Sequence, residues 1–397
     1  MSSTCRIWRR LQVPDPVRIH RYESLPEQGP KVLFFSGGSA FNKASRELKK
    51  FTHHSIHLVT PFDSGGSSAR LRAEFDMPAV GDLRSRLMAL ADETVMGQPD
   101  VYALFTHRFA QTDSLDVLAE QLQQLVDGHH PLIEPIPNPM RALIQTQLAV
   151  TQAKISPEFD LRGASIGNLI MAGGYLNNQQ QLDPIVFLFS RIVKTLGEVK
   201  TILDSPFHLG VELEDGSVIL GQHRITGKEH AHLKSPIKHI WLNKGLRGVV
   251  PINRQIADDR RDMIATADLI CYPPGSFYSS LLANLLPKGV GLSICDNPNP
   301  KVYIPNLGVD PEQIGLSLMG QVARLLSVIQ RDLDGQSVSN TFSALDYLLL
   351  DDSYDYGVLD IEELSRLGVQ VIKTPLIRHK VDRYDEALIV KALLSLT

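Results

Sequence analysis

The sequence predicts an α/β protein built on a doubly wound, mostly parallel sheet. Apolar runs of strand length recur along most of the 397 residues, and segments of helical periodicity lie between many of them. The segment from Leu115 to Val126, with leucines at 115, 118, 122 and 125, is one example. In 211–221 the turn Glu214-Asp215-Gly216 separates two alternating runs, which predicts an antiparallel hairpin in a small accessory subdomain.

The candidate strands are short apolar runs, the length expected of strands that are buried on both faces. A helix is expected to close the chain from about Asp385. The candidate strands lie at 32–35, 57–60, 101–105, 185–189, 209–213, 218–220, 238–242, 268–272, 302–304, 346–350 and 369–372.

The chain is expected to divide into a short N-terminal arm, 1–30, and one large domain, 31–397, with a helical insert at about 95–160. The arm carries basic residues but lacks the apolar stretch of a secretory signal. It has three open interpretations: it packs on the domain, it packs on a second subunit, or it stays solvated.

Composition excludes several classes of partner. A formal net charge of −4 gives no argument for binding nucleic acid or an anionic membrane. No apolar run reaches the roughly 18 residues that span a bilayer. Cys5, Cys271 and Cys295 are too few and too scattered for a disulfide framework or a thiolate metal cluster. We therefore expect a cytoplasmic protein.

The first motif is a glycine turn between a strand and a helix. The apolar run 32–35 ends in serines and glycines, a helical pattern follows, and Lys43 lies one turn inside it. This order presents backbone N–H groups to a phosphate, although neither the Walker spacing nor the third glycine of a dinucleotide fingerprint is present. The alternative is a tight turn with a solvated lysine. The candidate phosphate ligands are Ser36, Gly37, Gly38 and Ser39, with Lys43 as a point charge.

A second glycine turn follows the next candidate strand, 57–60. Asp63 lies at the strand end, where a carboxylate could coordinate Mg²⁺ or orient a hydroxyl. Two such turns on consecutive strands could converge on one ligand. The alternative is an N-cap aspartate with glycines that only turn the chain. The candidate ligand-binding residues after Asp63 are Gly65, Gly66, Ser67 and Ser68.

The third motif, GASIGNLIMAGGYLNN at 163–178, is an apolar helical pattern interrupted by glycines. Asn168 lies just after its first turn and could hydrogen-bond a base, sugar or phosphate. The alternative is close helix packing on small residues, because glycine costs about 1 kcal/mol inside a helix and needs a reason to be there.

The fourth motif is ADLICYPPGSFYSSLLANLLPKGV at 267–290. An apolar strand ends in Pro273-Pro274-Gly275-Ser276, and a helix begins near Tyr278. Gly275 and Ser276 would again offer backbone and hydroxyl groups at a strand end. Tyr278 could stack on a base or donate its hydroxyl to a sugar or phosphate. Alternatively, the aromatic side chains only cover the sheet edge.

Taken together, these motifs resemble the CofD/YvcK-like family, which includes 2-phospho-L-lactate transferase and the YvcK gluconeogenesis-type factors. The resemblance extends from about Lys31 to the C-terminus, with a weaker stretch at 95–160. Its most specific elements are DSGGSSARLR followed by MPAVGDLR, GASIGNLIMAG, HLGVELEDGSVILG and ADLICYPPGSFYSSLLANLLPKGV.

The resemblance implies a Rossmann-like fold with a phosphorylated ligand across the strand ends, and it suggests a homodimer. In the transferase branch a phospholactyl-type group passes, with Mg²⁺, from a guanosine nucleotide to the ribityl hydroxyl of a deazaflavin. In the YvcK branch the ligand resembles a UDP-sugar and the role is regulatory. Both branches carry an adjacent acidic pair where this chain has Asp63-Ser64, so the second acid is absent.

Two functions follow as hypotheses. The first is a Mg²⁺-assisted transferase that moves a 2-phospho-L-lactate-type group from a nucleotide-activated donor to a hydroxyl acceptor. In it Asp63 would hold the metal, and Lys43 would stabilise charge on the phosphoryl oxygens. The second is a non-catalytic sensor of a nucleotide or nucleotide-sugar, in which Tyr278 would contact the ligand.

Overall fold

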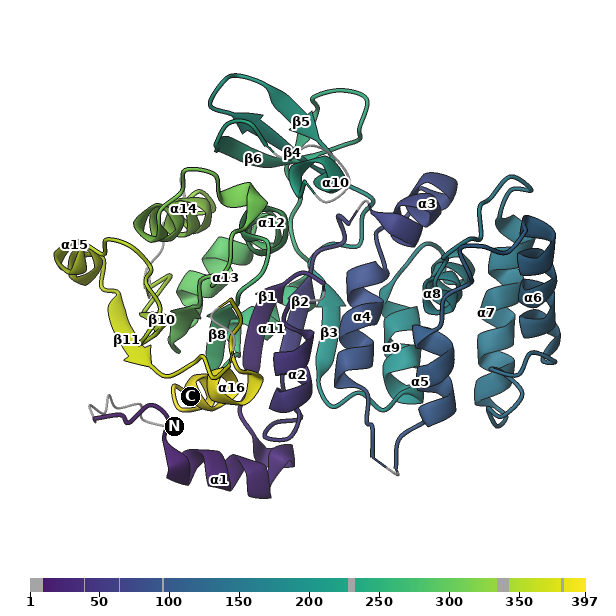
Figure 1. Cartoon of the computed structure of the whole chain (residues 1–397), viewed down its shortest axis with the longest axis horizontal. Coiled ribbons are helices and arrows are strands. Elements are labelled where there is room, and N and C mark those ends of the chain that lie inside the picture. Colours follow the sequence, from purple (N-terminus) through teal and green to yellow (C-terminus); the bar gives the residue numbers. More distant parts are fainter. Residues whose placement is uncertain are drawn as a thin grey trace.

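The computed structural model describes residues 10–38, 40–63, 65–94, 96–227, 233–333, 343–379 and 382–397. A seven-stranded parallel sheet lies at its centre, with strand order β11-β10-β9-β8-β1-β2-β3 (Figure 1). Strand order reverses at β1, because the chain first builds outward through β2 and β3 and then returns to place β8 on the other side of β1. This confirms the doubly wound α/β prediction.

The strands of the described chain are short, as expected for a sheet buried on both faces. They are β1 (Val32–Ser36), β2 (Ile56–Val59), β3 (Glu198–Thr201), β4 (His208–Leu213), β5 (Val218–Leu220), β6 (Ile237–Asn243), β7 (Pro251–Ile252), β8 (Leu269–Tyr272), β9 (Lys301–Tyr303), β10 (Tyr347–Asp351) and β11 (Gln370–Thr374).

Helices connect most of these strands. They are α1 (Pro16–Ser24), η1 (Pro26–Gln28), α2 (Asn42–Leu48), α3 (Gly66–Phe75), α4 (Gly81–Leu90), α5 (Pro99–Thr106), α6 (Leu115–Asp127), α7 (Met140–Lys154), α8 (Ile166–Asn177), α9 (Asp183–Ile192), α10 (Gln222–Ile225), α11 (Asp258–Ala265), η2 (Phe277–Leu282), α12 (Ala283–Leu285), α13 (Val290–Asp296), η3 (Pro311–Gln313), α14 (Leu318–Gln330), α15 (Ile361–Arg366) and α16 (Glu386–Leu394).

Both faces of the central sheet are buried, and alternate residues of β1 show this directly. Phe34 packs with α2 and α16 on one face. Phe35 packs with α13 and α14 on the other face. Because successive side chains of a strand point to opposite faces, a continuous apolar run is what a strand in this position requires.

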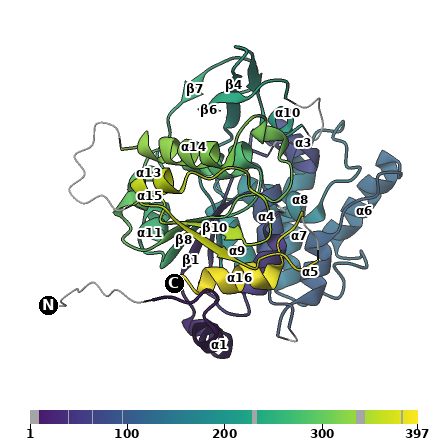
Figure 2. The ribbon, with the colours of Figure 1, turned by 60° about the vertical axis from the view of Figure 1, so that its left-hand side comes forward.

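The predicted hairpin belongs to a second sheet, which is antiparallel and has the strand order β5-β4-β6-β7. Gly210 of β4 lies against Trp241 of β6, and a Cβ at this glycine would come within 2.5 Å of the indole ring. Figure 2 shows this small sheet standing above the central sheet, with α10 at its base. Its inner side chains, among them Val211 and Ile240, join the core that covers one face of the central sheet.

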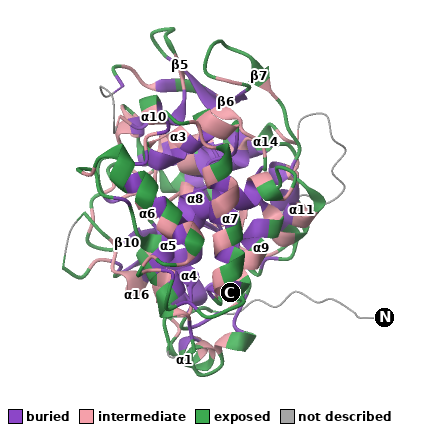
Figure 3. Ribbon diagram, turned by 90° about the vertical axis from the view of Figure 1, so that its right-hand side faces the viewer, coloured by how far each residue is buried: buried purple, intermediate pink, exposed green. Residues whose placement is uncertain are grey.

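Helices α3 to α9 form a lobe around α8, and Figure 3 shows the buried α8 between more exposed helices. The glycines of α8 serve close packing here. A Cβ at Gly173 would lie 1.9 Å from the carbonyl oxygen of Gln147, and one at Gly174 would lie 2.1 Å from Ile185. Packing therefore accounts for these two glycines without a ligand.

The described part of the N-terminal segment packs on the C-terminal helix. The backbone N–H of Asp15 donates to the Ser395 hydroxyl at 2.7 Å, and the Arg18 guanidinium donates to the Ser395 carbonyl at 3.2 Å. The division into arm and domain at residue 30 stays a prediction.

Two candidate strands were wrong: 101–105 lies in α5 and 185–189 lies in α9. A short apolar run has the same appearance in a buried strand and in a buried helix. Residues typical of a helix start precede each run. They are Pro99 before 101–105 and Asp183-Pro184 before 185–189. The expected list also lacked β3, whose residues include Glu198 and Lys200, and the two-residue β7.

Among the helices that the structure describes, none combines the length and apolar character needed to cross a bilayer.

Candidate functional site

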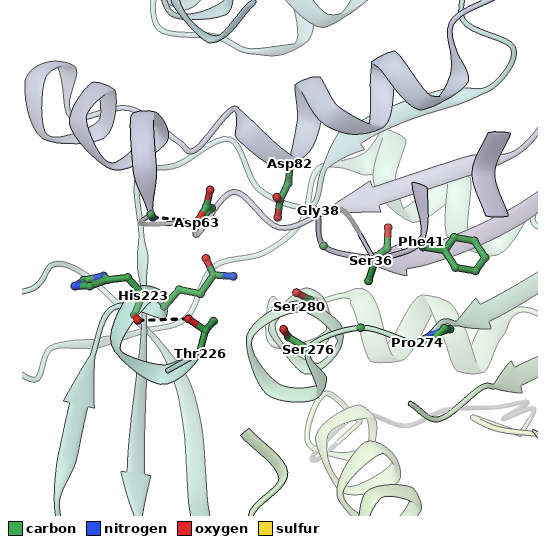
Figure 4. Close-up of a pocket in the computed structure, with 15 residues that line it drawn as sticks. Ser36, Gly38, Phe41, Asp63, Asp82, His223, Thr226, Pro274, Ser276 and Ser280 are labelled. Atoms are coloured by element: carbon green, nitrogen blue, oxygen red, sulfur yellow. Dashed lines mark hydrogen bonds between the residues drawn. The ribbon is translucent and has the colours of Figure 1, made fainter. Parts of the chain in front are cut away.

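A cavity of about 210 Å³ opens at the carboxyl ends of β1 and β8, where the strand order reverses. Open α/β sheets bind ligands at this place, because the chain leaves the two adjacent strands toward opposite faces. Figure 4 shows the cavity and its side chains. Its lining consists of Ser36, Gly37, Gly38, Ala40, Phe41, Asp63, Gly65, Asp82, Gln222, His223, Thr226, Pro274, Gly275, Ser276 and Ser280.

The turn after β1 needs glycine because side chains approach it closely. A Cβ at Gly37 would lie 2.2 Å from the hydroxyl oxygen of Ser280. A Cβ at Gly38 would lie 2.2 Å from Oδ1 of Asp82. The two glycines therefore let an acid and a hydroxyl from other elements reach the same turn.

Arg86 of α4 donates hydrogen bonds to this turn from the protein interior. Its side chain is fully buried, and its guanidinium donates to the carbonyls of Gly37 and Gly38 at 3.1 and 3.2 Å and to the Ser36 hydroxyl at 3.3 Å. Because C=O and N–H point in opposite directions across a trans peptide, binding of the Gly37 carbonyl turns the N–H of Gly38 away from Arg86. Asn284 acts similarly, donating to the Ser36 carbonyl at 3.0 Å.

The turn after β2 is held by a second buried arginine, Arg72. Its guanidinium donates to the carbonyls of Phe62 and Asp63 at 2.9 and 3.1 Å, and also to Phe207 at 2.6 Å. Within the turn, the N–H of Gly65 donates to Oδ1 of Asp63 at 3.1 Å. This bond orients the Asp63 carboxylate at the cavity wall.

Asp63 and Asp82 line the same cavity, and Gly81 allows their approach. A Cβ at Gly81 would lie 3.3 Å from Oδ2 of Asp63 and 2.7 Å from the Ser68 hydroxyl. Figure 4 shows the two carboxylates on one side of the cavity, with Ser276 and Ser280 on the other. The site therefore holds two acids, contributed by separate elements rather than by neighbours in the sequence.

Buried cations lie beneath the two turns. Burial lowers the pKa of Arg72, Arg84 and Arg86 to about 10 each, so all three stay protonated at neutral pH. The Arg72 and Arg86 acceptors named above are carbonyls and a hydroxyl, and Arg84 donates to the Asn168 side chain and the Phe105 carbonyl. The carboxylates of Asp63 and Asp82 interact electrostatically with these arginines, so the buried positive charge offsets the two acids of the cavity wall.

The turn after β8 is built differently. Gly275 has φ +155 and forms two hydrogen bonds with the Asn306 amide, at 2.8 and 2.7 Å. The next backbone N–H groups are occupied: Phe277 donates to Asp310, and Tyr278 and Ser279 donate to Glu312. Protein carboxylates thus cap the start of η2, and Ser276 and Ser280 of this segment line the cavity.

Several predicted residues lie at the cavity and others lie outside it. Asn168 and Ser67 are buried and hydrogen-bonded to each other at 3.1 Å, and the Ser68 hydroxyl accepts from the N–H of Gly81 at 3.0 Å. Gly66, with φ +53, is the first residue of α3. Of the site residues predicted from the sequence, those that line the cavity are Ser36, Gly37, Gly38, Asp63, Gly65, Gly275 and Ser276. Ser39 and Ser64 lie outside the described residues.

Tyr278 and Lys43 point elsewhere. Tyr278 is 2% exposed, and its hydroxyl donates to the Ile237 carbonyl at 3.3 Å. The Lys43 ammonium lies 3.4 Å from the carboxylate of Glu386 at the start of α16. Lys43 lines a second cavity of about 540 Å³ that shares Ala40, Phe41, Pro274, Gly275 and Ser276 with the first.

Sequence reasoning did not single out the contributions of α4, η2 and α10 to the cavity. Asp82 stands at the end of MPAVGD, in the first turn of a helix, where an acid is common for reasons of helix stability alone. Gln222, His223 and Thr226 come from the small sheet, and no spacing rule brings that sheet to the turn after β1. A weak signal was Gly221, whose φ of +97 marks a sharp bend before Gln222.

The fold and the cavity define a doubly wound α/β protein with an acidic and glycine-lined site at the strand-order reversal. The sequence matches the family described as 2-phospho-L-lactate transferase CofD over residues 32–377. The chain belongs to this CofD family, which confirms the resemblance stated from the motifs.

Known relatives agree with this assignment. The gluconeogenesis factor of Listeria innocua is 28% identical over 374 residues, covering 91% of this chain and 96% of that protein. The gluconeogenesis factor of Bacillus subtilis is 27% identical over 378 residues, covering 93% and 98%. A crystal structure of a UPF0052 family member from Bacillus halodurans shares the fold, with a TM-score of 0.68 at 24% identity over 92% of this chain and 99% of that one.

Proposed function

We propose that this chain transfers a 2-phospho-L-lactate-type phospho-ester group from a nucleotide-activated donor to a hydroxyl acceptor, with Mg²⁺. The observation that carries the proposal is the pair Asp63 and Asp82 at one cavity, opposite hydroxyls and beside two glycine turns above buried arginines. The family description supports a phosphorus-group transferase.

The donor set fits Mg²⁺. Carboxylate and hydroxyl oxygens are hard ligands, and Mg²⁺ in such sites takes one or two carboxylates and completes its shell with phosphate oxygens and water. Asp63 and Asp82 would hold the ion, and bound Mg²⁺ would neutralise charge on the phosphoryl oxygens.

The remaining residues would act by binding and positioning. The N–H groups of the turn after β1 would bind phosphate oxygens, and Arg86 would keep their carbonyls turned away. The two adjoining cavities give a ligand larger than a diphosphate room to extend past Pro274 and Gly275 toward Lys43. The Lys43 ammonium would then attract an anionic group there.

The test is turnover of nucleoside-diphosphate-linked phospho-ester donors with Mg²⁺ and hydroxyl acceptors, followed by release of the nucleoside phosphate. We expect activity that EDTA abolishes and that falls at least 100-fold in Asp63→Asn and in Asp82→Asn, since each substitution removes a charged ligand. Surface variant Glu362→Gln, on α15, is the matched control and retains activity.

Tight binding of a nucleotide or nucleotide-sugar without metal dependence, and without turnover of any donor, would reject the transferase and favour the sensor. The homodimer that the resemblance suggests stays a prediction, which sedimentation at micromolar concentration can check.

A further inference from the structure

Ser280, in η2, is held in a fixed position relative to the turn after β1. The fully buried side chain of Asn284 donates to the backbone carbonyls of both Ser36 and Ser280, at 3.0 and 2.9 Å. The N–H of Ser280 donates to the Ser276 carbonyl at 3.1 Å, and so does the N–H of Leu281. Contacts to its N–H and to its carbonyl therefore fix the Ser280 backbone against the end of β1.

The segment that carries Ser280 is a π-helix, a rare form that is frequent at functional sites. Its first turn is anchored as well, because the N–H groups of Tyr278 and Ser279 both donate to the buried carboxylate of Glu312. A side chain on this segment is thus positioned before any ligand binds, which is what a binding group needs in order to act without reorganisation.

The hydroxyl of Ser280 is unpaired and open to the cavity. The residue is half-buried and lines the cavity, and Oγ makes no hydrogen bond with any residue that the structure describes. Oγ is also absent from the unpaired side-chain atoms of the described chain that are fully buried, so a ligand can reach its surface. Figure 4 shows Ser280 on the wall of the cavity opposite Asp63 and Asp82.

Oγ of Ser280 points toward the turn after β1. A Cβ at Gly37 would lie 2.2 Å from this oxygen and 2.7 Å from the Cβ of Ser280, so the hydroxyl is the end nearer to the turn. The same point lies 3.6 Å from Oδ2 of Asp82. The hydroxyl and the carboxylate therefore approach one glycine from two sides, and a small group bound at this turn can contact both.

We propose that Oγ of Ser280 donates a hydrogen bond to an oxygen of the phosphate group that Mg²⁺ binds at Asp82. This hydroxyl is not hydrogen-bonded to a base that would activate it for attack, so donation is the chemistry it supplies. With one oxygen of the tetrahedral group on Mg²⁺, Ser280 holds another and so fixes the orientation of the phosphorus. This inference rests on the proposed function, because it takes the metal and phosphate site as given.

The test is titration calorimetry of Mg²⁺ alone and of pyrophosphate in saturating Mg²⁺. Ser280→Ala removes the hydroxyl, and we expect the pyrophosphate Kd to rise about tenfold because a hydrogen bond to a charged group is lost. The Kd of Mg²⁺ alone should stay within about twofold of the unchanged protein, since Asp63 and Asp82 remain in place. A general loss of structure would raise both values.

Two further variants separate hydrogen bonding from shape. Ser280→Cys keeps the size of the side chain but offers only a weak donor, so its pyrophosphate Kd should rise by about fivefold or more. Ser190→Ala, in α9, replaces another half-buried serine, which is not part of this cavity lining and whose hydroxyl donates to the Val186 carbonyl. It should alter neither Kd. Thermal unfolding of each variant checks that it folds.

The outcomes are distinct. If the unchanged protein does not bind pyrophosphate in Mg²⁺, the proposed phosphate site fails and this inference falls with it. If it binds and Ser280→Ala leaves the pyrophosphate Kd unchanged, or raises the Mg²⁺ Kd by the same factor, Ser280 does not contact the phosphate. The inference is then overturned while the phosphate site stands. Unchanged pyrophosphate binding in Ser280→Cys would also overturn it, because the side chain would act by filling space.

Discussion

Replacing Glu312 with glutamine tests whether its buried carboxylate stabilises the turn after β8. The burial and the pKa of Glu312 determine the sign and the size of the expected change in unfolding free energy. Glu312 is 1% exposed, and its carboxylate accepts from the N–H groups of Tyr278 and Ser279 at 2.9 and 2.8 Å. Burial, followed by the nearby Asp310 carboxylate, raises the pKa of Glu312 from 4.5 to about 7. Glutamine is isosteric and can keep these contacts without titrating.

The pH dependence follows from linkage. A carboxyl whose pKa is raised by folding binds its proton more tightly in the folded state, so its protonation favours folding below the folded pKa. This contribution is fully present below about pH 4.5 and is lost as pH rises through 7. Between pH 5 and pH 8, deprotonation of Glu312 should lower the free energy of unfolding by roughly 2 to 3 kcal/mol, given about 1.4 kcal/mol per unit of pKa.

The assay is denaturant unfolding of the unchanged protein and Glu312→Gln at pH 5, 6, 7 and 8. The difference in unfolding free energy between the two proteins should change by roughly 2 to 3 kcal/mol across this range, with the variant gaining relative to the unchanged protein as pH rises. Glu362→Gln, at an exposed site on α15, should show no such change. A difference that stays constant with pH would refute the raised pKa and the buried cap it implies.

Two substitutions address the turn after β1. Arg86→Lys cannot reproduce the forked contacts to Gly37 and Gly38, so we expect a loss of about 3 kcal/mol in unfolding free energy by urea denaturation. A loss under 1 kcal/mol would contradict the role of the guanidinium in holding this turn. Gly38→Ala places a Cβ against Asp82 and should weaken Mg²⁺ binding about tenfold by calorimetry at little cost in Tm. Unaltered Mg²⁺ affinity would mean that Asp82 does not hold the ion.

Local patterns were sufficient to predict six of the seven strands of the central sheet, all except β3. The run ending at Ser36 is β1, the run ending in Tyr272 is β8, and each is followed by a glycine-containing turn and a helix. These are short-range features, set by side-chain periodicity and by turn residues. The same periodicity failed at 185–189, because an apolar stretch of a few residues does not distinguish a buried strand from a buried helix.

The residues that hold the turns of the site could not be predicted from the sequence, for a different reason. Arg86 appears in the sequence as one charge in a helical segment, which normally indicates a solvated face. Only the fold shows that it is fully buried under a turn some 50 residues earlier, with carbonyls as its partners. Similarly, Gln222 lines the cavity only because the small sheet stands over the strand ends (Figure 2).

Asp63 and Asp82 likewise form a pair that only the fold reveals. By sequence, Asp63 is followed by a serine, so only one acid of the adjacent pair that the resemblance implies is present. In the structure Asp82 reaches the cavity from the first turn of α4, past Gly81 and against Gly38. Two carboxylates on separate elements can serve one ion only if the intervening turns keep them close, and here Arg72 and Arg86 hold those turns through their carbonyls. If the proposed metal binds here, its site therefore depends on buried arginines that are not themselves ligands, and a search for adjacent acids in the sequence would miss it.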